Sequence, residues 1–232
     1  MKATVLISLY KSQKFIQNKI ENIMEQTIFK ECEFMFIDGG TNDDELDIIR
    51  RFIIGKHNCH LIANKKGRIT LYEAWNRGIK ASSAPYICNS NTDDVLAPNA
   101  IERLIESLDG DNNISVTFPN VYTTTKPNSK WGTVTGGYIN TSANAVVGPF
   151  VMWRRSLHSK YGLFDGRLWV YGDAHWWNLL RSNHVVFKKV PDHLCIYLVG
   201  NGLERSCDDS GELLRVKDAK LLNLPKGSVE GW

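Results

Sequence analysis

Two adjacent aspartates, Asp93 and Asp94, follow a short apolar run within the segment Asn91-Thr92-Asp93-Asp94. Adjacent carboxylates repel each other unless a cation or solvent offsets their charge. A hard divalent cation such as Mg²⁺ or Mn²⁺ can share one or two carboxylates with phosphate oxygens. The same residues can also form a solvated turn and the N-cap of a helix that begins near Asn99. The segment therefore indicates a metal site or a helix cap with equal weight.

A third carboxylate, Asp173, lies in the segment Gly172-Asp173-Ala174-His175-Trp176-Trp177, among several aromatic residues. Aromatic faces suit sugar rings, and a partly desolvated aspartate can act as a general base. Alternatively, Asp173 caps an amphipathic helix whose tryptophans fill the core, and the pattern alone slightly favours this structural interpretation. His175 can bind substrate or a metal ion, although a lone histidine is more often a structural or surface residue.

Two further segments could contact a nucleotide. Asp38 ends an apolar run before a Gly-rich turn. A carboxylate there can accept a hydrogen bond from a nucleobase imide, although an Asx turn is the commoner outcome. The basic stretch Lys65-Lys66-Gly67-Arg68 can offset the charge of a pyrophosphate, and a solvated basic loop explains it equally well.

The elements that must position these residues alternate between two periods in the first half of the chain. Short apolar runs predict strands, and periodic apolar segments predict helices. The strands are expected at 4–9, 33–37, 59–63 and 85–88, and the helices at 14–25, from Asp43 or Asp44 through Phe52, and at 70–80. This alternation is typical of right-handed βαβ units in a mostly parallel sheet. In such sheets ligands bind beyond the carboxyl ends of the strands, where the turns 38–43 and 89–94 fall.

The second half of the chain is less regular. A polar stretch at 122–144 is long for a loop inside a compact domain, and loops of that length are often lids or binding loops. The other elements are predicted from apolar runs and periodicity. They are a helix at 99–108, a strand at 114–118, a strand at 145–153, a helix after it, the aromatic segment 169–180 and a terminal helix at 213–224.

The overall charge argues against a nucleic acid partner. The chain has 232 residues, 28 basic against 25 acidic, with a formal net charge of +3. Proteins that bind nucleic acids concentrate a basic stripe, which this sequence lacks. A weak attraction to an anionic membrane surface is compatible with this charge.

The cysteines and the N-terminus predict a cellular location. Five scattered cysteines form no Cys-x-x-Cys pair, so they predict neither a zinc knuckle nor a disulfide framework and favour a reducing compartment. The apolar run 3–9 is too short to span a membrane and has no small-residue cleavage site. We therefore predict a cytoplasmic protein, or one at the cytoplasmic face of a membrane.

Taken in order, these segments resemble the family 2 glycosyltransferases of the GT-A fold, from about Lys2 to Leu198. Each segment matches a part of that family's pattern at natural spacing. The matching segments are Val5–Tyr10, Gln26-Thr27, Phe36–Asp43, Gly67 with Ala74–Ile79, Asn91–Pro98, Gly148–Arg155, Tyr161–Asp165 and Gly172-Asp173.

The resemblance implies a fold and a reaction. The fold is an α/β fold of GT-A type, with a Rossmann-like, mostly parallel central sheet flanked by helices and a smaller acceptor-side subregion. Residues 1–98 would bind the nucleotide sugar, and residues 99–232 would carry the acceptor site, the base and the C-terminal helix of the same domain. The reaction is a metal-dependent, inverting transfer from a nucleotide sugar, UDP-linked by expectation, to a hydroxyl of a glycan or lipid-linked acceptor, in polysaccharide or glycoconjugate synthesis.

The resemblance also implies site residues. Asp173 would be the catalytic base, and Asp93 with Asp94 would hold Mn²⁺ or Mg²⁺. The nucleotide sugar would contact Ser8, Leu9, Tyr10, Asp38, Arg68, Asn76, Asn91, Thr92 and Asp93, and the acceptor Trp153, Tyr171, His175 and Trp176. Peripheral membrane association and a homodimer through apolar side chains of the terminal helix are further expectations.

Four positions depart from the family pattern. Asn91, Gly39, Trp75 and Gly172 stand where the family usually has Asp, Asp, Arg and Glu. They leave an inactive nucleotide- or carbohydrate-binding module on the same scaffold as an alternative. A nucleotidyltransferase is a weaker alternative, because it should have a Gly-rich loop after the first strand, and residues 10–14 contain no glycine.

Overall fold

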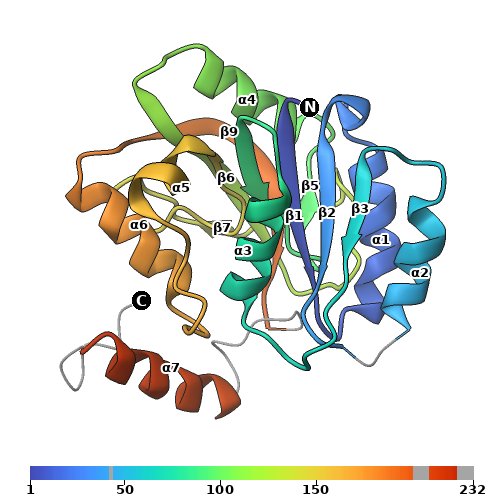
Figure 1. Cartoon of the computed structure of the whole chain (residues 1–232). Helices are drawn as coiled ribbons and strands as arrows, with labels where there is room; N and C mark the ends of the chain where they lie inside the picture. Colours follow the sequence, from blue (N-terminus) through green and yellow to red (C-terminus); the bar gives the residue numbers. More distant parts are fainter. Residues whose placement is uncertain (42–43, 201–208, 224–232) are drawn as a thin grey trace.

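The computed structural model describes residues 1–41, 44–200 and 209–223, and within them a nine-stranded sheet has helices on both faces (Figure 1). The strands lie in the order β3-β2-β1-β4-β8-β6-β9-β5, with β7 paired to β6. The strands that share one direction are β1 (Ala3–Leu9), β2 (Glu33–Asp38), β3 (Cys59–Ile62), β4 (Tyr86–Asn89), β6 (Ile114–Thr124) and β9 (Val186–Leu198). The opposite direction is taken by β5 (Val95–Leu96), β7 (Tyr138–Ile139) and β8 (Met152–Arg154). The predicted mostly parallel sheet is confirmed.

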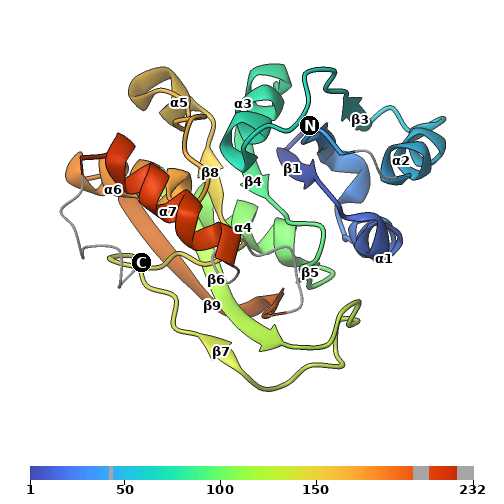
Figure 2. The same ribbon diagram turned by 90° about the horizontal axis from the view of Figure 1, so that it is seen from below.

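Alternating side chains of the buried strands divide the core into two layers. In β1, Val5 and Ile7 join one apolar cluster and Leu6 joins the other. The first layer is covered by α1 (Gln13–Met24), α2 (Glu45–Ile53) and α4 (Ala100–Asp109), and the second by α3 (Leu71–Ala81), α5 (Ser156–Tyr161) and α6 (Gly172–Ser182) (Figure 2). A short 3-10 helix, Phe29–Glu31, precedes β2.

The largest difference from the sequence-based prediction is β9, a strand of 13 residues that no apolar run indicated. Pro191 interrupts its pattern, and the pairing of β6 with β9 shifts register on either side of Asn120. A proline has no N–H for the ladder and is tolerated in a strand where a bulge breaks the pairing. Through β9, the second half of the sheet returns to β5 beside the acidic turn.

The strand predicted at 145–153 is wrong over most of its length, because regular pairing is confined to β8. Gly148 has a φ of 88°, outside the range of a strand, and Pro149 follows it without an N–H to donate. The loop predicted at 122–144 is partly wrong, because two parts of this segment are strands. Its start belongs to β6, and β7 pairs back onto β6 at Val121 and Tyr122.

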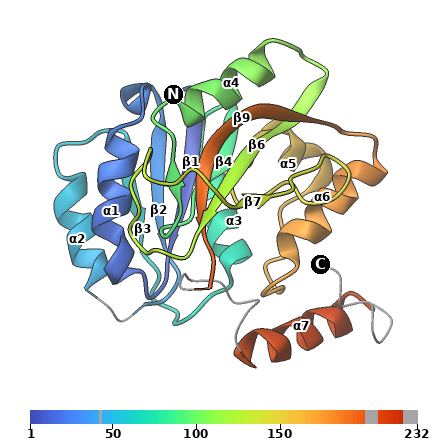
Figure 3. The same ribbon diagram turned by 180° about the vertical axis from the view of Figure 1, so that it is seen from behind.

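The last helix, α7 (Asp209–Leu221), confirms the predicted terminal helix and lies below α6 (Figures 1 and 3). Asp44 takes the N-cap position of α2, whereas Asp43, its alternative, lies outside the described residues together with Cys207 and Leu224. The other four cysteines are buried and free. Every described helix is too short or too polar to cross a membrane.

Candidate active site

The ends of β1 and β2 form the first wall of the candidate site. The Gly39 N–H donates to the Leu9 carbonyl at 2.7 Å, so the two strand ends are joined directly. Leu9 is fully buried, whereas Tyr10 is half-buried. The Ser8 hydroxyl is buried and has no hydrogen-bond partner among the described residues. The chain therefore leaves the sheet here in a rigid turn.

Asp38 is almost completely buried and forms an Asx turn with a long-range bond. One carboxylate oxygen accepts from the N–H groups of Gly40 at 2.7 Å and Thr41 at 3.2 Å. The other accepts from the N–H of Asn64 at 3.1 Å. A carboxylate with several N–H donors is strongly fixed. Asp38 thus ties the loop after β2 to the loop after β3.

The loop after β3 brings Arg68 between two aromatic rings. Its guanidinium lies 4.8 Å from the centre of the Tyr10 ring and 4.9 Å from that of Trp169. Such cation–π contacts hold a guanidinium without using its N–H donors. Gly40 allows the approach of this loop, because a Cβ there would lie 2.2 Å from the Gly67 carbonyl oxygen. Arg68 thus connects the end of β1 with the segment before α6.

The paired aspartates lie in the turn that connects β4 to β5, and they differ in environment. The Asp94 carboxylate is 2% exposed and accepts from the Asn91 side-chain amide at 2.9 Å and the Leu198 N–H at 3.4 Å. Burial raises the pKa of the Asp94 carboxyl well above its usual range, and the charge of Asp93 raises it further. Asp93 is 9% exposed. The Thr92 hydroxyl is buried and has no hydrogen-bond partner among the described residues.

Helix α1 supports this turn with a fully buried lysine. Lys19 Nζ lies 2.9 Å from Ser90 Oγ and 2.6 Å from the Asp94 carbonyl oxygen. Burial lowers the pKa of the Lys19 ammonium, and the Asp94 carboxylate opposes that change. Asn22, further along the helix, and Gln26, two residues past its end, bond the backbone of Leu96 and Ala97. Two polar side chains of α1 and one just after it therefore fix the acidic turn and the strand after it.

Asp173 lies in the first turn of α6, half-buried, and contacts a tyrosine of α3. Tyr72 Oη lies 2.9 Å from Asp173 Oδ1 and 2.6 Å from the Val170 carbonyl oxygen. Burial raises the pKa of the Asp173 carboxyl, against the opposing effects of the Tyr72 hydroxyl and the Ala174 N–H. A carboxylate with a raised pKa next to aromatic residues is a chemically suitable proton acceptor.

Three of the four residues predicted to bind the acceptor are buried, and one is exposed. Trp153 and Trp176 are 0% and 1% exposed, and their rings pack against each other in the core. Their indole N–H groups bond His158 and Gly162. The structure thus gives both rings a packing role in place of the predicted acceptor contact. Tyr171 is buried as well, at 7% exposure, and His175 is exposed on α6.

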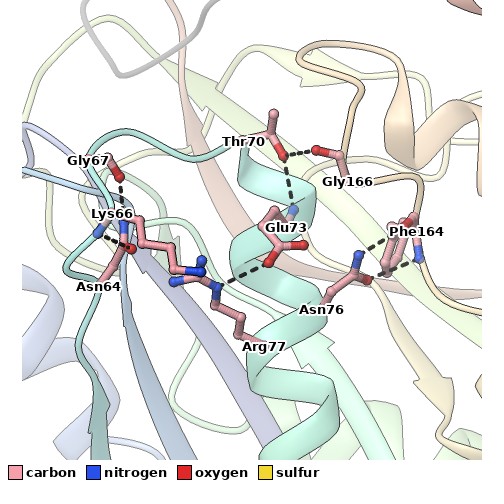
Figure 4. A network of polar contacts seen from close by, with 9 residues as sticks. All are labelled: Asn64, Lys66, Gly67, Thr70, Glu73, Asn76, Arg77, Phe164 and Gly166. Atoms are coloured by element: carbon pink, nitrogen blue, oxygen red, sulfur yellow. Dashed lines mark hydrogen bonds and ion pairs between the residues drawn. The ribbon is translucent and has the colours of Figure 1, made fainter.

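Asn76, predicted to contact the donor, is buried and joins α3 to the segment before α6 (Figure 4). Its amide donates to the Phe164 carbonyl at 2.8 Å and accepts from the Phe164 N–H at 3.1 Å. Six residues earlier, the Thr70 hydroxyl caps α3 and donates to the Gly166 carbonyl at 2.7 Å. These bonds hold the segment 164–166 against α3.

Replacing Asn76 with alanine is expected to lower the free energy of unfolding by about 2–4 kcal/mol, because two backbone groups of Phe164 would be buried without partners. Urea denaturation measures this difference. Arg77→Ala is the matched control on the same helix, since its pair with Glu73 at 3.1 Å is partly exposed and contributes about 0.5 kcal/mol. A loss below 1 kcal/mol for Asn76→Ala would contradict the structural role and favour the predicted donor contact.

Mn²⁺ or Mg²⁺ fits the acidic turn through Asp93. Within residues 1–41, 44–200 and 209–223, no three His, Cys, Asp or Glu side chains are grouped to hold a metal ion. A hard cation nevertheless needs only one or two carboxylates when phosphate oxygens and water supply the rest. Asp94 is the more buried of the pair, at 2% exposure against 9%, so Asp93 is the carboxylate more accessible to a cation.

The model of the family described as Glycosyl transferase family 2 matches residues 4–165, more than half of the chain. The chain belongs to this family. The match includes the ends of β1 and β2, Arg68 and the acidic turn, and it stops before Asp173.

Curated relatives of this family 2 chain are longer proteins. Glycosyltransferase GlyG of Streptococcus pneumoniae is 26% identical over 107 residues, 45% of this chain and 34% of the relative. Chondroitin synthase of Escherichia coli is 26% identical over 136 residues, 58% of this chain and 19% of the relative. The chain therefore spans about a third or less of the length of these relatives.

Solved glycosyltransferase structures share the fold. TarS of S. aureus, residues 1–349 in complex with UDP-GlcNAc, has a TM-score of 0.75 at 16% identity. The match covers 99% of this chain and 69% of the TarS chain. Mannosyltransferase PcManGT of Pyrobaculum calidifontis, in complex with GDP-Man and Mn²⁺, has a TM-score of 0.70 at 15% identity. The match covers 95% of this chain and 61% of the PcManGT chain. At this identity the likeness concerns the fold alone, which is of the expected GT-A type.

Proposed function

We propose that this family 2 protein moves a sugar from a UDP-linked donor to an acceptor hydroxyl with inversion at the anomeric carbon, in polysaccharide or glycoconjugate synthesis. The observation that carries the proposal is the meeting of donor-side and acceptor-side segments around Arg68. That side chain contacts Tyr10 at the end of β1 and Trp169, four residues before Asp173. A donor bound at the strand ends would therefore present its sugar toward Asp173.

The donor would lie along the ends of β1 and β2. Ser8, Leu9 and Tyr10 would bound the nucleobase, and Asp38 would keep the turn beside it in one shape through its three N–H partners. Arg68 would keep its N–H donors for the diphosphate, because its guanidinium contacts the faces of the Tyr10 and Trp169 rings. The solved structures of TarS with UDP-GlcNAc or UDP and of PcManGT with GDP-Man support a nucleotide or nucleotide sugar as the ligand.

Asp93, with Asn91 and Thr92 in the same turn, would hold Mn²⁺ or Mg²⁺ against the diphosphate. A bound cation of this kind supplies Lewis-acid stabilisation of the charge that forms on the departing nucleoside diphosphate. The chain contributes a turn of fixed shape, because Lys19 bonds Ser90 and the Asp94 carbonyl beneath it. Asp94 would then stabilise the turn through its bonds to Asn91 and Leu198, although it was predicted as a second ligand of the cation.

Asp173 would remove the proton of the acceptor hydroxyl while that oxygen attacks the anomeric carbon from the face opposite the nucleotide. The new bond forms between the acceptor oxygen and the anomeric carbon, and the bond from that carbon to the diphosphate oxygen breaks with its electron pair. Attack from the opposite face inverts the configuration. Tyr171 and His175, beside Asp173, would bound the acceptor.

The experiment that tests the proposal is release of the nucleoside diphosphate from a panel of nucleotide sugars, with Mn²⁺, with Mg²⁺ and with a chelator. We expect metal-dependent release of UDP from at least one UDP-sugar, at a rate at least about tenfold above that with chelator. Release that is equal with and without metal would reject the metal assignment. Binding of no nucleotide or nucleotide sugar under any condition would reject the transferase.

A second candidate function is a nucleotide-binding protein of the same fold without turnover. The observation that favours it is the acidic turn, where Asn91 takes the place of an aspartate and its amide donates to Asp94. This protein would bind UDP in the same assay and release none from any donor. The two candidates therefore differ in turnover and agree in binding.

The acceptor, the location and the assembly stay predictions. We propose a glycan or lipid-linked acceptor and a cytoplasmic protein, at the inner face of the membrane when the acceptor is a lipid. A homodimer would use the apolar side chains of α7, where Leu213, Val216 and Leu221 are 74%, 45% and 41% exposed. Sedimentation with and without Leu213→Glu measures the dimer, and vesicle flotation measures the membrane association.

A further inference from the structure

The C-terminal helix places a buried carboxylate in a concave group of backbone N–H donors. Asp218 of α7 is 0% exposed. Its carboxylate accepts from the N–H groups of Trp169 at 3.0 Å, Val170 at 2.7 Å and Tyr171 at 3.0 Å. Successive backbone N–H groups that converge in this way form an anion-binding nest, and bonds to a carboxylate are charge-assisted. Asp218 thus fixes the loop that leads into α6.

This loop is connected to Asp173 by one side chain. The Val170 carbonyl, on the residue whose N–H meets Asp218, lies 2.6 Å from Tyr72 Oη. The same hydroxyl lies 2.9 Å from Asp173 Oδ1. A chain of polar contacts therefore runs from α7 through the loop and Tyr72 to the candidate base. Asp173 and Asp218 both lie beyond residues 4–165, the segment that the family model matches.

The hydroxyl of Tyr72 has a single proton for two acceptors. When Tyr72 donates to Asp173, the carboxylate gains a bond that orients it, and when it donates to Val170, that bond is lost. The balance depends on where the Val170 carbonyl lies, and Asp218 accepts from the Tyr171 N–H, which belongs to the same planar peptide group as that carbonyl. The ring of Tyr72 is itself fixed, because it packs edge-on against Trp75 and leaves no room for a Cβ at Gly172.

We propose that Asp218 and Tyr72 are positioning residues for the base Asp173. Asp218 holds the loop 169–171 in one conformation, and the Tyr72 hydroxyl then lies within hydrogen-bond distance of the Asp173 carboxylate as well as of the Val170 carbonyl. The inference rests on the proposed transferase function. Through Asp218, α7 would support the active site without touching the reacting atoms.

The test compares Asp218→Asn and Tyr72→Phe with wild type in the full chain. Each change is nearly isosteric. We expect kcat for UDP release to fall at least about tenfold in both variants, while the Kd for UDP with Mn²⁺ changes less than threefold. Hydrogen exchange at the amides of 169–171 should accelerate in Asp218→Asn and stay unchanged in Tyr72→Phe. Glu212→Gln, an isosteric change at an exposed carboxylate of α7, is the control and should match wild type in every measurement.

Two results would overturn the inference. The first is faster exchange at 169–171 in Asp218→Asn with kcat within threefold of wild type, because the loop would then be loosened without effect on the base. The second is an equal loss of kcat and UDP affinity together with a lower Tm, which assigns α7 a general structural role. Wild-type protein that releases no UDP refutes the proposed function instead, and the exchange measurement still decides whether Asp218 holds the loop.

Discussion

Asp173→Asn is expected to lower kcat for sugar transfer by about 10²–10⁴-fold, the range that a positioned general base contributes. An asparagine has nearly the same shape and can still accept from the Ala174 N–H, as Oδ1 of Asp173 does at 2.8 Å. It cannot accept the proton of the acceptor hydroxyl. The affinity for the donor should change little, because the donor-side residues lie on other loops.

The pH dependence follows from the same carboxyl. Burial raises the pKa of Asp173, and only the ionised form is a base. The rate should therefore rise with pH through a pKa above the usual value for aspartate, about 3.9. It should fall as the pH drops below that raised pKa. In Asp173→Asn, the residual rate should lose this acidic limb, which is the fall in rate at low pH.

Initial rates of UDP release across pH, together with UDP binding by calorimetry, check both expectations. A kcat within threefold of wild type, with the acidic limb unchanged, would remove Asp173 from the chemistry. The exposed carboxylate of Glu212 again provides the control, since Glu212→Gln should leave both the rate and its pH profile as they are.

The first half of the fold follows from local patterns. Strands β1, β2 and β4 are short runs buried on both faces, and the helices have apolar stripes, so each of these elements could be predicted from its own residues. Residues of β9 alternate less regularly and include Pro191, and the partner that accommodates this proline is β6, about 70 residues earlier in the chain. Long-range pairing of this kind leaves no local signal.

The candidate site was predictable where it belongs to the family pattern. Tyr72, Lys19 and Asp218 were not singled out, because each acts through contacts with distant segments. Lys19 had a signal, since position 19 falls at helical spacing within the apolar stripe of Phe15, Ile16, Ile20 and Ile23. A lysine within such a stripe is either at its margin or buried with partners.

The tryptophans illustrate the opposite error. Trp153 and Trp176 suited a sugar-binding site by residue type, yet both fill the core between β8 and α6. Aromatic residues contribute the largest apolar area per side chain, so an aromatic segment serves the core at least as well as a ligand. Sequence alone does not separate a core residue from a ligand-binding one, because the two differ only in which face of β8 or α6 meets the core.

Asp93→Asn is expected to raise the Kd of the Mn²⁺–UDP complex at least about tenfold, the lower range for a change in the surroundings of a bound metal. The substitution keeps the volume of the side chain and removes the charge that a hard cation requires. Binding of UDP in the presence of a chelator should not change, because it depends on the strand ends. Calorimetric titration of UDP with and without Mn²⁺ separates the metal-dependent part of the affinity from the metal-independent part.

Asp94→Asn is the matched comparison one residue away. Its carboxylate is buried, its pKa is well above the usual range, and its partners are Asn91 and Leu198. An amide there loses little charge interaction with a cation outside, so we expect less than a threefold change in the Mn²⁺-dependent affinity. The reverse order, with Asp94→Asn the more damaging for metal and Asp93→Asn near wild type, would exchange the roles of the two aspartates. It would also place the cation on the side of the turn that faces Lys19, whose Nζ lies 2.6 Å from the Asp94 carbonyl oxygen. The ammonium form of Lys19 would repel a cation there, which is a second physical reason to expect Asp93 as the ligand.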